Sequence, residues 1–244
     1  NKYPEAELLA INICEKFPNE TISWKILGII YLMSGRYNKA LFANKRALKL
    51  GSNTPDVLNN LSITLYNLGR YEEAIINSKE ALKIDKNFFQ AYGSLADSLK
   101  ALKKYEDASF YLKRAILLNS QKVETYVSLA DVLVKLDKSD DALATYEKAI
   151  NLDSNHLPAY INMAETLNNL GRFQEAIRVY NVVSRIKPDI PLVYYNLANL
   201  QKKLNLNKDA INNFKRALEL NPNFADAHYN LANTYSNMDE MYLA

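Results

Sequence analysis

Hydrophobic positions along the chain recur at helical spacing, in short blocks separated by turns. Tyr92, Leu95, Ala96 and Leu99 follow one another at intervals of three and four residues, which places all four on one side of an α-helix. Blocks of about 14 residues follow each other in pairs along the chain. A helix with one apolar side cannot bury that side alone, so neighbouring blocks are expected to stack. The pattern predicts an all-α solenoid of paired helices.

The pattern repeats with a period of 34 residues. Shifting the chain by this period aligns a gap-free row of alanines: Ala6, Ala40, Ala74, Ala108, Ala142, Ala176, Ala210 and Ala244. Two further rows of mostly small residues keep the same period: Gly28, Ser62, Ala96, Ala130, Ala164, Ala198 and Ala232, and Ala47, Ala81, Ala115, Ala149, Val183 and Ala217. Because small side chains let helix backbones approach closely, we expect these rows to be buried where helices meet.

A turn is predicted between the two helices of each repeat. With residue 21 as position 1 of the first full repeat, position 15 reads Gly35, Gly69, Lys103, Asp137, Gly171, Asn205 and Asp239. Gly, Asn and Asp are the residues that best tolerate a left-handed backbone, and only Lys103 departs from that set. The recurring Gly-Arg pair, as in "NNLGRFQEA" at 168–176, is therefore interpreted as a joint between helices and not as a ligand site.

Polar residues occupy some of the predicted packing positions. Asn44 and Ser78 stand at position 24 of their repeats, and Gln201 stands at position 11. We interpret these as places where the packing is locally soft. His228 stands at position 4, where other repeats have Trp24 and Tyr92, and it is interpreted as a packed ring.

A 34-residue repeat with this pattern resembles the tetratricopeptide repeat (TPR). The first full repeat, 21–54, contains residues of that family's motif: Trp24, Leu27, Gly28, Tyr31, Gly35, Tyr37, Ala40 and Ala47. The other full repeats are 55–88, 89–122, 123–156, 157–190 and 191–224, with 1–20 as the second helix of a preceding repeat and 225–244 as a partial repeat. The resemblance implies one array, a right-handed superhelix of antiparallel helix pairs. Because Ala244 falls on a packing position and not in a polar cap, we expect a fragment of a longer protein.

Composition and charge exclude several classes of function. A net charge of +3 with no concentrated basic patch argues against a nucleic-acid partner. The longest apolar run, 26–33, is too short to insert across a membrane. One cysteine, Cys14, and two distant histidines, His156 and His228, indicate no metal site, no cofactor and no catalytic residues. We expect no enzymatic activity in this stretch, although a full-length protein could carry a catalytic domain.

Candidate binding residues lie on the side of each first helix opposite the packing stripe. Position 6 there reads Ile26, Asn60, Ser94, Ser128, Asn162, Asn196 and Asn230. An asparagine side chain carries both a donor and an acceptor, so a row of them in a groove can hold an extended peptide backbone. Acids at position 9 favour basic or hydroxyl-rich segments, and tyrosines at position 5 add contact surface. The predicted peptide-binding residues are Asn60, Asn162, Asn196, Asn199, Asn230, Asn233, Asp97, Asp131, Glu165, Tyr195 and Tyr229.

Three functions remain open. The first is a scaffold that binds a protein or peptide ligand in its groove. The second is the substrate-recognition arm of a larger enzyme, because "NPNFADAHYNLANTY" at 221–235 is similar to repeats of the O-linked N-acetylglucosamine transferases. That resemblance implies that Asn60, Asn162, Asn196 and Asn230 contact a substrate backbone. The third is end-to-end self-association through the terminal helices.

A carboxylate clamp of the chaperone-binding TPR class is a further alternative for the groove. Asn196, Asn199, Lys203 and Asn230 partly match the lysine- and asparagine-rich pattern of that class. Position 5 is Tyr195 instead of a lysine, so the clamp is incomplete.

Overall fold

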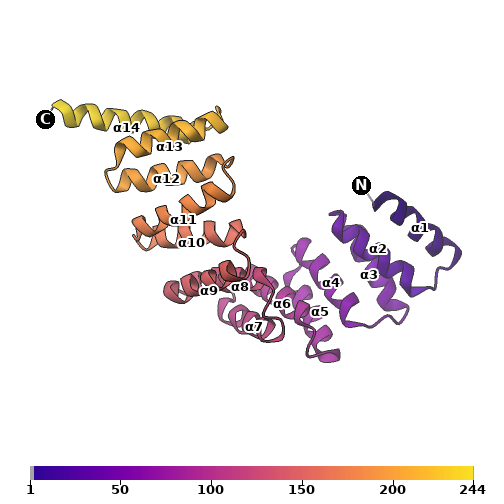
Figure 1. Cartoon of the computed structure of the whole chain (residues 1–244). Coiled ribbons are helices and arrows are strands. Elements are labelled where there is room, and N and C mark those ends of the chain that lie inside the picture. The colour runs from indigo at the N-terminus through magenta and orange to yellow at the C-terminus, as the bar shows by residue number, and fades with distance from the viewer. Residues whose placement is uncertain (1–2, 244) are drawn as a thin grey trace. The chain divides into compact units, whose positions relative to one another are not determined.

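The structure is a computed structural model that describes residues 3–243, with side-chain surroundings for residues 4–236. All regular elements in this part of the chain are α-helices (Figure 1). They are α1 (Tyr3–Lys16), α2 (Thr21–Met33), α3 (Tyr37–Lys49), α4 (Pro55–Asn67), α5 (Tyr71–Ile84), α6 (Phe89–Ala101), α7 (Tyr105–Leu118), α8 (Val123–Lys135), α9 (Ser139–Leu152), α10 (Leu157–Asn169), α11 (Phe173–Ile186), α12 (Pro191–Lys203), α13 (Asn207–Leu220) and α14 (Ala225–Leu243). The predicted all-α architecture of consecutive antiparallel pairs is confirmed.

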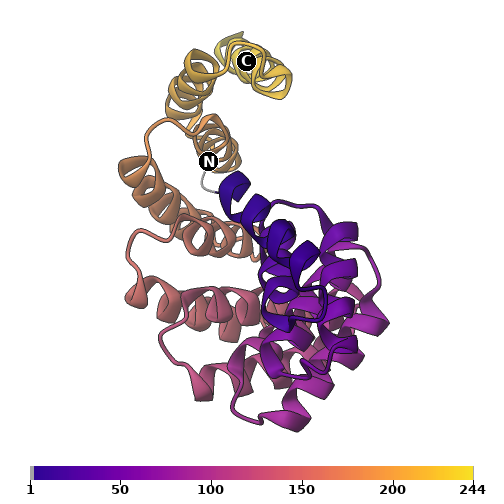
Figure 2. The same cartoon turned by 90° about the vertical axis from the view of Figure 1, so that its right-hand side faces the viewer.

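The chain forms two compact units, an N-terminal unit up to Val132 and a C-terminal unit from Leu133 on. In the N-terminal unit α2 pairs with α3, α4 with α5, and α6 with α7. Figure 2 shows from another side that short loops join the helices of this unit. The first helices of successive pairs also touch directly, α2 with α4 and α4 with α6. They therefore line the inner side of this unit, and the second helices α3, α5 and α7 form its outer side. In the C-terminal unit α10 pairs with α11 and α12 with α13, and α12 touches α14.

The rows of small residues lie in the core as predicted. From Ala40 to Ala210 the first row is fully buried, and in the other two rows the residues from Ser62 to Ala198 and from Ala47 to Ala217 are almost completely so. The two ends of the rows differ. Ala6 and Ala232 are exposed, because no described helix packs against those faces of α1 and α14, and Ala244 lies outside the described residues.

The turn position adopts the predicted left-handed backbone throughout the inner repeats. The φ angles are 72° at Gly35, 74° at Gly69 and 73° at Gly171, with 59° at Lys103, 57° at Asp137 and 59° at Asn205. Lys103 thus takes the same conformation as the others, despite its side chain. The prediction is wrong at Asp239, where α14 continues as a single helix to Leu243. Continuing the helix keeps the backbone groups of that short segment hydrogen-bonded.

Aromatic residues at position 4 connect several of the first helices to the end of the preceding repeat. Trp24 Nε1 donates a hydrogen bond to the carbonyl oxygen of Pro18 at 3.0 Å, and the Tyr92 hydroxyl donates to that of Lys86 at 3.2 Å. His228 Nε2 lies 2.9 Å from the carbonyl oxygen of Pro222 in the same relation. The interpretation of His228 as a packed ring is wrong, because its side chain is exposed and its ring nitrogen makes the contact.

The polar residues at packing positions are accommodated in different ways. Ser78 and Ser62 share a hydrogen bond of 2.6 Å between their hydroxyl groups, and Ser62 also donates to a backbone carbonyl. Gln201 Oε1 accepts a hydrogen bond from Asn213 at 2.8 Å. Asn44 is fully buried with its Oδ1 unpaired, and it presses on Gly28, where a Cβ would lie 2.3 Å from that oxygen. Gly28 is therefore required by the polar side chain opposite it.

Candidate functional site

The predicted binding residues fall into both units. Asn60 on α4, Asp97 on α6 and Asp131 on α8 belong to the N-terminal unit. The C-terminal unit holds the other predicted residues: Asn162, Glu165, Tyr195, Asn196, Asn199, Tyr229, Asn230 and Asn233. The position-6 asparagines of both units are half-buried, which is more than their placement on an exposed helix face suggested.

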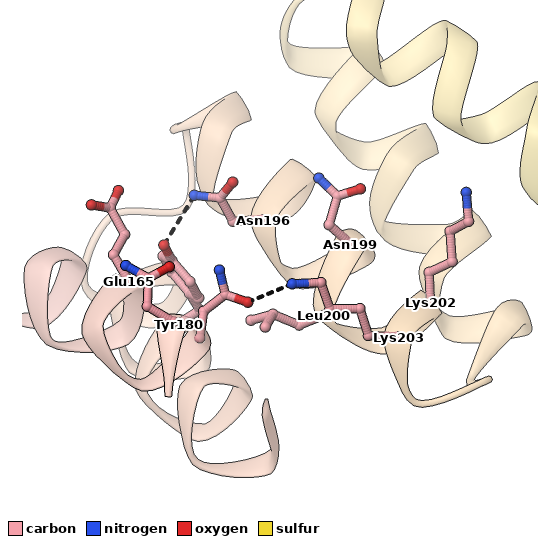
Figure 3. A pocket seen from close by; sticks show the side chains of 9 residues that line it. Glu165, Tyr180, Asn196, Asn199, Leu200, Lys202 and Lys203 are labelled. Atoms are coloured by element: carbon pink, nitrogen blue, oxygen red, sulfur yellow. Dashed lines mark hydrogen bonds between the residues drawn. The ribbon is translucent and has the colours of Figure 1, made fainter. Parts of the chain in front are cut away.

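A cleft of about 690 Å³ in the C-terminal unit gathers part of the predicted set (Figure 3). It is bordered by α10, α11 and α12, and Glu165, Asn196 and Asn199 line it. Lys203, named above only for the carboxylate-clamp alternative, also lines it, and the remaining lining residues were not predicted: Asn168, Asn169, Tyr180, Leu200 and Lys202. The cleft therefore combines side-chain amides with charges of both signs.

Tyr180 holds Asn196 in place from within the core. The ring of Tyr180 is 2% exposed, and its hydroxyl oxygen accepts a hydrogen bond of 3.0 Å from Asn196 Nδ2. Figure 3 shows this contact at the edge of the cleft, with the other end of the Asn196 amide directed away from the phenol. Burial raises the pKa of Tyr180 to about 12, and the nearby Glu165 carboxylate acts in the same direction. The phenol therefore stays neutral at ordinary pH and fixes one end of the amide.

Asn230 is held by a second tyrosine in the same unit. Its Nδ2 lies 3.0 Å from the Tyr195 hydroxyl and 3.3 Å from Asn199 Oδ1. The Tyr195 ring stacks on Phe224 with ring centroids 4.8 Å apart, so this tyrosine is fixed in the packing. Tyr229, in contrast, is 71% exposed. Two predicted residues, Asn199 and Asn230, thus contact each other directly, and Tyr195 supports them.

Charged groups stand on both sides of the cleft. The Glu165 carboxylate lies on the α10 side, and the ammonium groups of Lys202 and Lys203 lie on α12. Lys203 Nζ donates to Asn168 Oδ1 at 2.8 Å and sits 4.9 Å from the centre of the Phe173 ring. The ammonium group of Lys203 is thus already bound within the protein. In a carboxylate clamp this group would have to contact the carboxylate of the ligand instead.

The N-terminal unit has a smaller cleft of about 340 Å³ on its inner side. Asp97 lines it together with Asn59, Ser94, Tyr66 and Lys122, but Asn60 does not. Ser94 Oγ donates a hydrogen bond of 2.8 Å to Asn59 Oδ1. Asn59, the buried neighbour of Asn60, thus makes a contact within the protein at this cleft, and peptide binding by Asn60 stays a prediction.

The described residues also bear on metal binding and on membrane insertion. Among the described residues, no group of three or more His, Cys, Asp and Glu side chains is placed to bind a metal ion. Within the same part of the chain, no helix combines the length and the apolar character that a membrane span requires.

Comparison with protein-family models identifies repeats in both units. A model described as TPR repeat matches residues 164–205 and 204–239, and one described as tetratricopeptide repeat matches residues 56–84. A third, described as anaphase-promoting complex, cyclosome, subunit 3, matches residues 101–183. A search of curated protein sequences gives no match.

Solved structures of similar fold are helical repeat proteins. YrrB, described as a TPR protein with an unusual peptide-binding site, aligns with a TM-score of 0.62 and 21% identity over 77% of this chain and 96% of YrrB. PilF of Pseudomonas aeruginosa aligns with a TM-score of 0.72 and 19% identity over 87% of this chain and 97% of its own. A chain of the APC/C hetero-tetramer Cut9-Hcn1 aligns with a TM-score of 0.73 and 16% identity, over 96% of this chain and 46% of its own length. At these identities the likeness concerns the fold.

Proposed function

We propose that this chain, which is a tetratricopeptide repeat protein, binds an extended peptide of a partner protein in the inner cleft of its C-terminal unit. The observation that carries the proposal is a pair of side-chain amides that tyrosines hold in place. Asn196 lines the cleft and is held by Tyr180, and Asn230 contacts the lining residue Asn199 and is held by Tyr195. A side chain fixed before binding loses little entropy when a ligand arrives, so each contact contributes more to affinity.

The orientation of these amides defines what they recognise. Because Nδ2 of Asn196 donates to the Tyr180 hydroxyl, Oδ1 is the end that remains to accept a hydrogen bond. Extended peptides present backbone N–H groups along their length. The amide oxygens in the cleft therefore bind the main chain of the peptide through its N–H groups. Glu165 on one side and Lys202 on the other select peptides by their charged side chains.

The fold comparison supports a peptide ligand in general terms. YrrB, which shares the fold, is described as having an unusual peptide-binding site. The narrower resemblance to the O-linked N-acetylglucosamine transferases rests on residues 221–235 and on the asparagine positions, so the role of an enzyme's recognition arm stays a prediction.

The proposal is tested with a peptide selected from a random library of about ten-residue extended peptides. Replacement of Asn162, Asn196 and Asn230 together by Ala should weaken its binding at least tenfold, since a hydrogen bond contributes roughly 1 kcal/mol. Asn212→Ala, on the outer helix α13, is the matched control and should leave the affinity unchanged. Fluorescence anisotropy of the labelled peptide measures both. Equal affinity of the triple variant and the wild type would refute the proposal.

The asparagine substitutions are also expected to lower the stability of the fold. Asn196→Ala removes the partner of a buried tyrosine hydroxyl, so it should lower the free energy of unfolding by about 1–2 kcal/mol. Binding is therefore compared at a temperature where circular dichroism shows each variant to be folded. A peptide N-methylated at its backbone amides provides a second test, because it removes the donors and leaves the protein intact. Undiminished binding of that peptide would contradict the role of the amide oxygens.

A further inference from the structure

The outer side of the N-terminal unit carries a row of exposed hydrophobic side chains. Position 22 of four successive second helices is occupied by Leu8, Phe42, Ile76 and Phe110, on α1, α3, α5 and α7. They are 61%, 64%, 58% and 55% exposed, respectively. At the same repeat position the C-terminal unit has Ala144, Arg178 and Asn212. The row is therefore a feature of one unit and not of the repeat itself.

A row of lysines runs beside the hydrophobic row. Lys45, Lys79 and Lys113 lie three residues after Phe42, Ile76 and Phe110, which puts each lysine next to an apolar side chain on the helix surface. All three are exposed, and none joins an ion pair with another described residue. In the C-terminal unit the same position holds Glu147, Asn181 and Lys215, so the lysine row also stops.

Two clefts open beside this row. The first, of about 520 Å³, lies between α1, α2 and α3, where Phe42 meets Trp24 with ring centroids 5.8 Å apart, and Ile11 and Cys14 complete its apolar wall. The second, of about 410 Å³, is lined by Phe110, Tyr92 and Leu117. Each cleft is large enough for apolar side chains of a ligand, and each is bordered by a residue of the row.

We propose that this outer surface, formed by α1, α3, α5 and α7, binds an amphipathic helix of a partner protein with an apolar face and an acidic flank. The apolar face covers Phe42, Ile76 and Phe110, and anchor side chains enter the two clefts. The acidic flank lies along Lys45, Lys79 and Lys113, where exposed ammonium groups attract carboxylates. Contiguous apolar surface rimmed by charge is typical of protein interaction sites. This surface is separate from the inner cleft of the C-terminal unit.

The charges on the other side of the row favour a protein over an anionic membrane. Glu72, Glu106 and Asp107 lie in the first turns of α5 and α7, on the far side of the hydrophobic row from the lysines. An anionic bilayer would meet these carboxylates together with the lysines and be repelled by them. A peptide helix can place acidic residues on one flank only.

The test uses synthetic helical peptides of about 20 residues, with leucines at the i, i+3, i+4 and i+7 spacing and glutamates on one flank. The wild-type chain should bind this acidic probe saturably. A second probe with lysines in place of the glutamates should bind at least tenfold more weakly. Vesicles of phosphatidylcholine with phosphatidylserine should not bind, and the mass of the protein in light scattering should stay independent of concentration.

Variants locate the binding to the proposed surface. The triple change Lys45→Glu, Lys79→Glu and Lys113→Glu should weaken binding of the acidic probe at least tenfold. Ile76→Ser should weaken it several-fold, and because Ile76 is exposed the chain should remain folded. Leu192→Ser, at a 50% exposed leucine of the C-terminal unit, is the matched control and should have no effect. The proposal is overturned if the acidic probe fails to bind, if these variants bind it normally, if vesicles bind in its place, or if the mass rises with concentration.

Discussion

The two units place different residues at the same position of the repeat, and this difference sets the properties of their inner surfaces. Position 24 holds Asn44, Ser78 and Leu112 in the N-terminal unit, and Tyr146, Tyr180 and Phe214 in the C-terminal unit. A tyrosine there is long enough to cross the core, and Tyr180 reaches Asn196 in the cleft. Ser78 is too short for this, and its hydroxyl bonds to Ser62 within the core.

A packing position can therefore serve a binding site that lies on another helix. In the C-terminal unit the buried ring of Tyr180 packs in the core, and its hydroxyl group also holds the side chain of Asn196. In the N-terminal unit the serine Ser94 on α6 contacts Asn59 on α4, and no residue at position 24 takes part in that hydrogen bond. The outer surfaces differ as well, because the row of exposed apolar residues at position 22 lies on second helices of the N-terminal unit. The shared repeat secures the fold, and the residues that vary within it decide which face of each unit can bind.

Among the substitutions that test this difference between the units, the largest loss of stability is expected at Gly28. A methyl group there would lie 2.3 Å from Asn44 Oδ1 in a fully buried contact, so Gly28→Ala should lower the free energy of unfolding by about 3 kcal/mol. Ala164 takes the same position in the C-terminal unit beside Tyr180, and it is tolerated there. Chemical denaturation measures the change. Asn44→Leu added to Gly28→Ala should restore most of the stability, as the Ala96 and Leu112 pair shows; a double variant no more stable than Gly28→Ala would contradict this reading.

The next effect concerns the buried phenol of the C-terminal unit. The pKa of Tyr180 is raised to about 12, above the ordinary value of 10, because its burial disfavours the phenolate. The folded state therefore holds the proton more tightly than the unfolded state. The resulting stability is fully present below pH 10 and is lost as pH rises toward 12, by about 2–3 kcal/mol in total.

Tyr180→Phe isolates this effect from the other tyrosines. The variant should be less stable at neutral pH by about 1 kcal/mol, because Asn196 loses its hydrogen-bond partner. It should lose less stability than the wild type between pH 10 and 12, as measured by denaturant unfolding at each pH. Identical pH dependence of the two proteins would show that Tyr180 does not titrate late.

The fold was predictable from the sequence because it depends on a strict period. Small residues at a 34-residue spacing specify where helices meet, and the structure buries them from Ala40 to Ala217. The support of the site was not predicted, because the contact from Tyr180 to Asn196 joins position 24 of one repeat to position 6 of the next. A tyrosine at position 24 is equally compatible with plain packing, and the sequence pattern does not indicate where its hydroxyl lies. His228 was misread for a related reason, since an aromatic position can be used through its ring nitrogen at the surface.

The smallest effect compares the turns of the two units. Lys103 in the N-terminal unit has a φ of 59°, while Gly171 in the C-terminal unit takes the equivalent conformation at 73° without steric cost. A left-handed conformation costs a residue with a Cβ about 1–2 kcal/mol, and replacing it by glycine removes this cost. Part of the stability gained is offset, because glycine has greater conformational freedom in the unfolded chain. Lys103→Gly should therefore raise the free energy of unfolding by about 0.5–1 kcal/mol, measured by denaturant unfolding. Lys104→Gly is the matched control, because Lys104 has a φ of −87° and gains nothing from glycine. If both glycine variants were less stable than the wild type, the side chain of Lys103 would have to contribute contacts that outweigh its backbone strain.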